Sequence, residues 1–362
     1  MTVQYTDEVA SQGGCGSFKL LIRWRGSVYK TVWQDILVYL IFYFTISFIY
    51  RFALPEKERK IFEKIVLHFT HYRDVIPVSF VLGFYVGLVV GRWWDIYRTV
   101  PWPDAAAILA ATYVPGMNRE ARRVRVTLLR YVNLSIAITF ATISPVVKER
   151  LRTIYDFRRE GYITEHELHI LNKLEEQTDQ HKAWVPIMWA CKTLQRARHE
   201  GLITCDVALR ALIDEVLSIR LKCGSLLGYY GNNIPLVYTQ VVTVAVYIYF
   251  AFSLLGEQFL DPTKGYSDQL VDYYVPLFAL LQLFFYLGWL NVAAALLNPF
   301  GDDDHDFEFL KFLERNIQMS KLLSETAPSD LPRGLDDSVK HVKFHDKLVV
   351  ESINYYDDHV TY

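Results

Sequence analysis

The sequence predicts an all-α membrane protein, in which transmembrane helices continue into a cytosolic helical bundle. Hydrophobic residues make up 52% of the 362 residues and charged residues only 22%, whereas soluble domains carry about 25% charged residues. Four segments are long and apolar enough to cross a bilayer, which takes roughly 20 residues. Outside these segments, no stretch shows the period-two alternation of a strand, and helical spacing recurs.

The four candidate spans are residues 33–54, 75–94, 231–256 and 273–297. The last two contain no charged residue, which is rare in the core helices of soluble proteins. The second has a shorter uncharged core, residues 76–90, so a buried core helix is a stronger alternative there. Tyr and Trp gather near the ends of the spans, as at membrane interfaces.

Loop charges predict the orientation. Residues 95–230 carry 19 Lys and Arg and should be cytosolic, whereas residues 257–272 carry four acidic side chains and only Lys264, and should face outside. Four spans then place both termini in the cytosol. The loop 51–74 disagrees, because it holds six Lys and Arg yet must lie outside. The predicted regions are an N-terminal segment, spans one and two, a cytosolic helical region, spans three and four, and an acidic tail: 1–32, 33–98, 99–230, 231–297 and 298–362.

Several classes of protein are disfavoured. A net charge of −2 lacks the basic footprint of a nucleic-acid-binding protein. The cysteines have no CxxC spacing, which indicates reduced thiols, and we expect no cleavable signal peptide. No catalytic set converges, so we expect no enzyme. The four cysteines are Cys15, Cys191, Cys205 and Cys223, and the two HxxH pairs, too few for a membrane metal oxidase, are His68/His71 and His166/His169.

Local signals predict the helices between the spans. Asp104 and Asp206 are candidate N-caps, and Thr164 with Glu167 forms a capping box. Arg pairs alternate with Val and Leu at helical spacing over residues 120–139. The tail 301–362 is predicted to be extended.

A stripe of apolar side chains runs along the second span. Its bulky members recur every four residues and therefore share one helix face: Ile76, Phe80 and Phe84. Small residues follow with the same period, within about 100° of arc: Gly83, Gly87 and Gly91. The stripe favours either close packing through small residues or a pore-lining face with an apolar constriction. It carries no charge, so ion selectivity would come from helix N-termini and the positive edges of aromatic rings.

An acidic cluster follows the fourth span. Five carboxylates lie within seven residues: Asp302, Asp303, Asp304, Asp306 and Glu308. They are either solvated or neutralised by a hard cation such as Ca²⁺. An EF-hand is excluded, because the positions that need Gly and Glu hold Phe307 and Leu313. Negative charge at a helix C-terminus is unfavourable, which favours a compensating cation.

Six motifs together resemble the bestrophin family, and the similarity runs from Met1 to about Leu331. The motifs are Trp24-Arg-Gly-Ser, Ile76-Pro-Val-Ser-Phe-Val-Leu-Gly-Phe-Tyr-Val, Arg92-Trp-Trp, Pro101-Trp-Pro-Asp, Ile234-Pro-Leu-Val-Tyr-Thr-Gln-Val-Val and Asn298-Pro-Phe-Gly-Asp-Asp-Asp. The resemblance implies a homopentameric, Ca²⁺-activated, chloride-conducting channel of the cell membrane with one central pore. It implies a hydrophobic neck at Ile76, Phe80 and Phe84, and a cytosolic aperture at Val207.

The resemblance also implies a Ca²⁺ clasp. Side-chain carboxylates would come from Asp303 and Asp306, and backbone carbonyls from Ala295, Asn298 and, from a neighbouring subunit, Ala10. The sequence departs from the family where His305 replaces a common acidic residue and Ala295 replaces a polar one. The alternatives of another class are a membrane anion transporter and a structural membrane scaffold with a Ca²⁺-binding tail.

Overall fold

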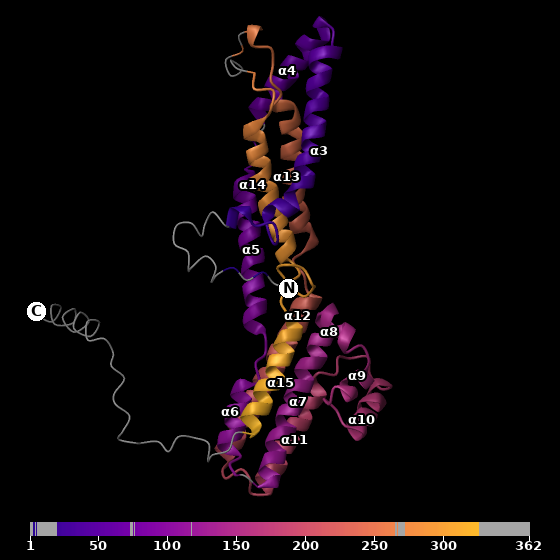
Figure 1. Cartoon of the computed structure of the whole chain (residues 1–362), viewed down its shortest axis with the longest axis vertical. Coiled ribbons are helices and arrows are strands. Elements are labelled where there is room, and N and C mark those ends of the chain that lie inside the picture. Colours follow the sequence, from indigo (N-terminus) through magenta and orange to yellow (C-terminus); the bar gives the residue numbers. More distant parts are fainter. Residues whose placement is uncertain are drawn as a thin grey trace, which may run out of the picture.

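The computed structural model describes residues 3, 5, 20–72, 75, 77–116, 118–264, 266 and 272–325. The secondary structure within these residues is helical, without strands, as the sequence predicts. The helices form an elongated molecule with two halves stacked end to end (Figure 1).

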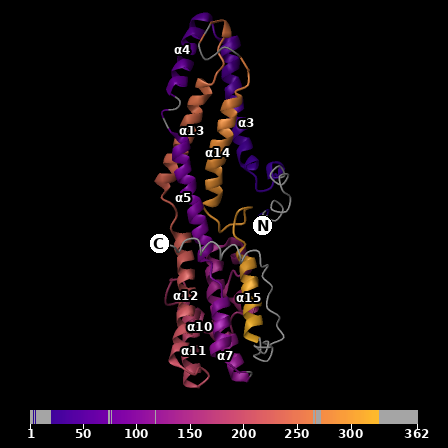
Figure 2. The same cartoon turned by 90° about the vertical axis from the view of Figure 1, so that its left-hand side faces the viewer.

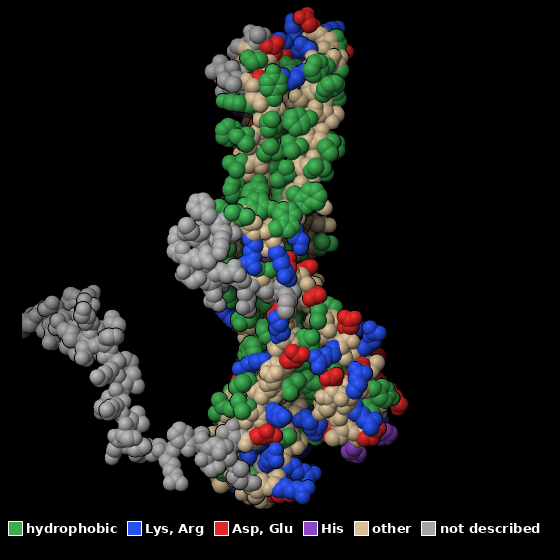
Figure 3. Space-filling view, viewed as in Figure 1, with side chains coloured by type: hydrophobic (Ala, Val, Ile, Leu, Met, Phe, Trp, Pro, Cys, Tyr) green, Lys and Arg blue, Asp and Glu red, His purple; other side chains and the backbone are tan. Residues whose placement is uncertain are grey.

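The first half is an apolar bundle of four long helices that lie side by side (Figures 1 and 2). They are α3 (Val28–Phe48), which continues into the π-helical turn Ile49–Ala53, α5 (Val78–Thr99), α13 (Leu236–Gly256) and α14 (Leu277–Leu296). Each contributes to one core, for example through Tyr43, Leu82, Val246 and Leu283. Hydrophobic side chains also cover much of the face of this half that Figure 3 shows, as expected of a bilayer-embedded bundle.

A more polar helix, α4 (Glu56–Tyr72), lies at the outer end of the apolar half. It packs closely on α13, because Gly256 leaves room for the α4 backbone: a Cβ there would lie 3.1 Å from Thr70 N. Glu63, which is buried, accepts hydrogen bonds from Tyr50, Lys264 and Tyr266 and so ties three segments together.

The second half is a helical bundle around α7 (Arg119–Ile143). Its other members are α6 (Asp104–Tyr113), α8 (Pro145–Arg150), α9 (Ile154–Arg159), α10 (Glu165–Glu175), α11 (Trp184–His199), α12 (Asp206–Gly231) and α15 (Phe309–Glu325). One large core joins them.

Length and composition select four helices that could span a membrane: Val28–Ala53, Arg119–Ile143, Leu236–Gly256 and Leu277–Leu296. Three match predicted spans, but α7 takes the place of α5. The apolar window of α7 is 61% buried within the chain, against 17–33% in the other three, because α7 is the centre of the second half. In contrast, α5 packs in the core of the apolar half. That packing favours α5 as the second span, which stays a prediction.

Several predicted boundaries are wrong by a few residues. The third span does not begin at Gly231: α12 ends there, and α13 starts only after Pro235, because proline lacks the N–H that a continuous helix needs. Asp104 and Asp206 are the first helical residues rather than the caps. Pro103 precedes the first, and at the second the Cys205 sulfur accepts from Ala208 N.

The tail is not extended throughout, because α15 occupies residues 309–325. Its buried side chains, including Phe309 and Leu313, recur at helical spacing and enter the core of the second half. Three small polar residues, each four apart, form a seam along it: Asn316, Ser320 and Ser324. Asn316 donates to Pro101 O, Asn133 donates to Ser320 Oγ at 2.8 Å, and Arg125 donates to Ser324 O.

The predicted capping box is confirmed, and it belongs to a buried ion pair. Thr164 N donates to Glu167 at 2.8 Å, and Glu167 N donates to Thr164 Oγ1. The Glu167 carboxylate also accepts from Arg130 at 2.6 and 2.7 Å and from Tyr131. Burial alone would raise the pKa of Glu167, but hydrogen bonds from Arg130 and Tyr131 outweigh it and lower the pKa to about 2.

We expect this ion pair to make the second half sensitive to acid. A carboxylate with a lowered pKa stabilises the fold above its unfolded pKa near 4.5, and this contribution, about 3 kcal/mol, is lost as the pH falls toward 2. Glu167→Gln should therefore lower the melting temperature at pH 7 but little at pH 2, measured by circular dichroism in detergent. Glu165→Gln, which breaks only an exposed pair with Arg158, should change it little at either pH.

Candidate functional site

An aromatic face lies at the outer end of α5. Pro77 precedes this helix, and its carbonyl accepts from Phe80 N and Val81 N, which sets the first turn. Phe80 and Phe84 are 64% and 63% exposed, and their ring centroids are 4.7 Å apart, edge to face. The opposite face, including Leu82, is buried in the bundle. The structure thus brings two predicted neck residues together, and the third, Ile76, lies outside the described residues.

The glycines of α5 continue this face without packing on anything the structure describes. A Cβ at Gly83, Gly87 or Gly91 would meet no atom of the described residues within 4 Å. Among the described helices of one chain, close packing through small residues is therefore not their role. The face is open to lipid, to water or to another copy of the chain.

Val207 is the second residue of α12, a helix that begins at the far end of the second half (Figure 2). Its side chain is 78% exposed. At the corner that carries it, Arg198 near the end of α11 contacts Asp206 at 2.7 Å. This is a suitable place for an exit constriction, 127 residues beyond Phe80 in sequence.

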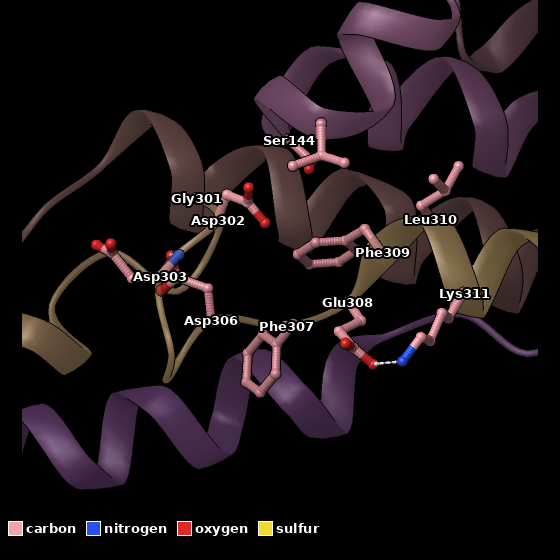
Figure 4. Close-up of a pocket in the computed structure, with 11 residues that line it drawn as sticks. Ser144, Gly301, Asp302, Asp303, Asp306, Phe307, Glu308, Phe309, Leu310 and Lys311 are labelled. Carbon is pink, nitrogen blue, oxygen red and sulfur yellow. Dashed lines mark hydrogen bonds and ion pairs between the residues drawn. The ribbon is translucent and has the colours of Figure 1, made fainter. Parts of the chain in front are cut away.

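The acidic cluster forms a compact loop between α14 and α15. Asp303 N donates to Asp306 Oδ2 at 2.8 Å, and Asp306 N donates to Asp303 O. Asp306 is only 4% exposed. Gly301 lies against it, since a Cβ on Gly301 would be 2.6 Å from Asp306 Oδ2. Figure 4 shows Asp302 directed toward Ser144 and Phe309, whereas the Asp303 side chain points the other way.

The charges of the loop differ in their surroundings. Asp304 contacts Arg25 at 3.1 Å and Lys30 at 3.3 Å, and these cations hold its pKa below the usual range. For Asp306, burial and the nearby Asp303 and Asp302 raise the pKa. The buried carboxylate is therefore the one that gains most from added positive charge.

The donors of the loop fit a hard cation. A cavity of about 170 Å³ lies beside the loop, and Gly301, Asp303 and Asp306 are among its lining residues and offer oxygen. Ala295 lies in the last turn of α14, where carbonyls have no partner within the helix, and Asn298 follows as an exposed residue. The oxygen-only chemistry suits Ca²⁺.

Side chains alone do not complete such a site. Within the described residues, no three His, Cys, Asp or Glu side chains converge to hold a metal, and this includes both HxxH pairs. Backbone carbonyls and water must therefore supply the remaining ligands. Ala10 lies outside the described residues. In the same chain, Val3 N donates to Asp304 O, so Val3 reaches this loop.

Sequence reasoning missed the cations that hold the loop. Arg25 and Lys30 are 279 and 274 residues away from Asp304, too far for any local pattern to pair them. One signal was present, since Arg25 belongs to the motif Trp24-Arg-Gly-Ser. The positive charge of this Arg complements the net negative loop. Charge alone, however, does not show which of the 38 Lys and Arg residues pairs with Asp304.

Comparison with known proteins identifies a family with this sequence. The family model described as "Bestrophin, RFP-TM, chloride channel" matches residues 1–325. Bestrophin-2 of Mus musculus is 45% identical over 331 residues, 91% of this chain and 65% of the relative. Human Bestrophin-1 is 43% identical over 334 residues, 92% of this chain and 57% of the relative. The chain thus spans about half to two thirds of the length of the curated relatives it matches.

A solved structure shares the fold. The crystal structure of a bacterial bestrophin homolog from Klebsiella pneumoniae aligns with a TM-score of 0.55 at 14% identity, over 83% of this chain and all of the other. At that identity the likeness concerns the fold alone. The family model and the two animal relatives decide the assignment, together with apolar helices that mark an integral membrane protein. The chain belongs to the bestrophin family.

Proposed function

We propose that the protein is a subunit of a passive, anion-selective channel without catalytic activity, and that copies of it surround one pore lined by α5. The observation that carries the proposal is the exposed Phe80–Phe84 pair, which continues into the open glycine face of a helix in the apolar half. Aromatic side chains paired edge to face on one side of such a helix suit a narrow apolar neck. Five copies is the number that the family resemblance implies.

Anion selection at this neck would rest on dehydration. Phe80, Phe84 and the glycines carry no charge, so the positive ring edges and the start of α5 are the attractive groups. Weakly hydrated anions should then pass at least as well as chloride. The predicted orientation, with both termini cytosolic and the protein in the cell membrane, belongs to this proposal.

Three lysines on α4 support an anion pathway. Lys57, Lys60 and Lys64 are exposed and recur at helical spacing, within about 60° of arc. Together they account for half of the basic residues that made the loop 51–74 an exception to the orientation rule. A basic helix face at the outer mouth of the pore would concentrate anions there. These lysines would then serve conduction, and their charge would carry no information about the orientation of the protein in the membrane.

Planar-bilayer recording of the purified protein tests the function. We expect Ca²⁺-dependent current with a bi-ionic potential that favours thiocyanate over chloride. A strong preference for chloride would contradict selection by dehydration. Silence in the bilayer would favour the scaffold, whereas flux that saturates and couples to a second ion would favour a transporter. The latter is disfavoured, because α13 and α14 contain no ionisable acidic or basic side chain at mid-membrane.

We also propose that Ca²⁺ opens the channel by binding at the acidic loop. Asp303 and Asp306, with carbonyls of Ala295, Asn298 and a neighbour's Ala10, would hold it. Bound Ca²⁺ supplies the positive charge that the crowded carboxylates need. The loop connects α14 with α15, and α14 packs on α5. A change in the loop would therefore be transmitted through α14 to the neck residues on α5. If each of several equivalent sites in a ring binds Ca²⁺ modestly more tightly in the open state, these preferences add up in free energy and shift the whole channel toward opening.

Val207 is proposed as a sieve rather than a gate. Val207→Ala should alter the relative permeability to anions of different size and hydration, and leave Ca²⁺ activation unchanged, because it widens an apolar exit far from the acidic loop. Reversal potentials in mixed anion solutions measure the first and Ca²⁺ titration of current the second. A lost Ca²⁺ response with unchanged selectivity would reverse the assignment.

A further inference from the structure

A short segment before α3 exposes large apolar side chains where the apolar half ends. Leu21, Ile22 and Trp24 are 59%, 83% and 58% exposed, and α3 begins only four residues after Trp24. Lys and Arg side chains gather at the lower edge of the apolar surface (Figure 3). Exposed apolar side chains at the end of a membrane span, next to basic ones, are typical of a segment that lies in the membrane interface.

The same segment builds a basic hollow. A cavity of about 330 Å³ is lined by Arg23, Arg25, Gly26, Ser27 and His305, with Val3, Tyr5 and Leu20. Gly26, at φ 68°, turns the chain, and Ser27 closes the turn by donating its hydroxyl to Trp24 O at 2.7 Å. Arg23 and Arg25 flank Trp24 in the sequence, and both line the hollow. Arginine binds phosphate oxygens through two parallel N–H donors.

One of the cations that line this hollow, Arg25, also holds the acidic loop, together with Lys30 in the first turn of α3. Arg25 and Lys30 contact Asp304, yet their side chains remain 60% and 55% exposed, so an anion can reach them from outside. Exposed ion pairs are weak and exchange readily. The cytoplasmic leaflet is rich in anionic lipids, which attract basic residues near its surface.

We propose that Arg23, Arg25 and Lys30 bind the phosphate-bearing headgroup of an anionic phospholipid, while Leu21, Ile22 and Trp24 lie among its chains, and that this headgroup competes with Asp304 for Arg25 and Lys30. Lipid binding by itself is independent of channel activity. Its effect on opening rests on the proposed function of the acidic loop. Free phosphate has the same headgroup chemistry, but the apolar side chains beside the hollow favour the lipid.

The experiment measures lipid contact at Trp24 without any current. The protein is reconstituted with brominated phosphatidylserine or brominated phosphatidylcholine, and the Trp24 signal is the quenching that disappears in Trp24→Phe. We expect stronger quenching by the serine lipid. Arg25→Gln should weaken that preference about fivefold, as one lost charge at the surface predicts, whereas Arg25→Lys should keep most of it. Arg210→Gln, an exposed arginine at the far end of α12, is the control and should change nothing.

The competition between Asp304 and the headgroup predicts opposite effects on lipid preference for variants of Asp304 and of Arg25. Asp304→Asn releases Arg25 and Lys30 and should strengthen the preference for phosphatidylserine, whereas Arg25→Gln weakens it. Equal quenching by both lipids in the unmodified protein would overturn the proposal. So would an Arg210→Gln effect as large as that of Arg25→Gln, or an Asp304→Asn variant with lowered preference. If dissolved inorganic phosphate abolishes the preference, the hollow takes free phosphate and the lipid is the wrong ligand.

Discussion

Replacing Ile76, Phe80 and Phe84 together by alanine is expected to produce anion current that no longer needs Ca²⁺. The change removes three large side chains from each copy of the proposed neck. A wider, less apolar ring stays wetted, so the closed state loses the barrier that dewetting provides. In planar bilayers, the ratio of current with and without Ca²⁺ should fall from a large value to near one.

The matched control truncates the same number of exposed apolar side chains on another helix of the apolar half. Val237, Val241 and Val244 on α13 are 70%, 60% and 52% exposed. Their triple alanine variant should keep its Ca²⁺ dependence, because it leaves the aromatic face of α5 intact. Full Ca²⁺ dependence in the α5 triple variant, at normal expression and assembly, would place the gate elsewhere.

Asp303→Ala is expected to raise the Ca²⁺ concentration for half-maximal current at least tenfold, about 1.4 kcal/mol per site. The substitution removes a charged ligand from a site with few charged ligands. Asp306→Asn should have a similar effect while it keeps an oxygen that accepts from Asp303 N, so the loop stays folded. Ca²⁺ titration of the current measures both.

Two kinds of control separate a built site from a diffuse negative surface. Asp302→Ala and Glu308→Ala remove charge from exposed or paired positions, since Glu308 contacts Lys311 at 2.7 Å, and should shift the titration much less. Gly301→Ala removes no charge but displaces the Asp306 carboxylate, so it should shift the titration strongly, whereas Gly228→Ala has open space and should not. Equal shifts in all four carboxylate variants would contradict the clasp.

The sequence predicted the helical class, three of the spans and the capping box, because each rests on local pattern. The capping box at Thr164 needs only two residues three apart, and α13 and α14 need only a run without charge. The aromatic pair on α5 was also predictable, since i, i+4 spacing fixes a shared face.

What the sequence could not predict depends on tertiary contacts. Whether α5 or α7 meets lipid depends on which helix the rest of the chain surrounds, because each contains an apolar run beside charged residues. The helix α15 was missed, because the charges before it and the Pro and Ser residues after it concealed a short apolar stripe. The pairing of Asp304 with Arg25 and Lys30 joins opposite ends of the chain.

The polar seam of α15 has a mechanical consequence. Apolar surfaces can slide past one another at little cost, but Asn316, Ser320 and Ser324 meet their partners at three successive turns, so a slide of one residue, about 1.5 Å along the axis, would disturb all three hydrogen bonds together. The helix α15 is thus fixed lengthwise. Because the acidic loop connects this fixed helix to α14, a change in the length or stiffness of the loop would be taken up by a tilt of α14.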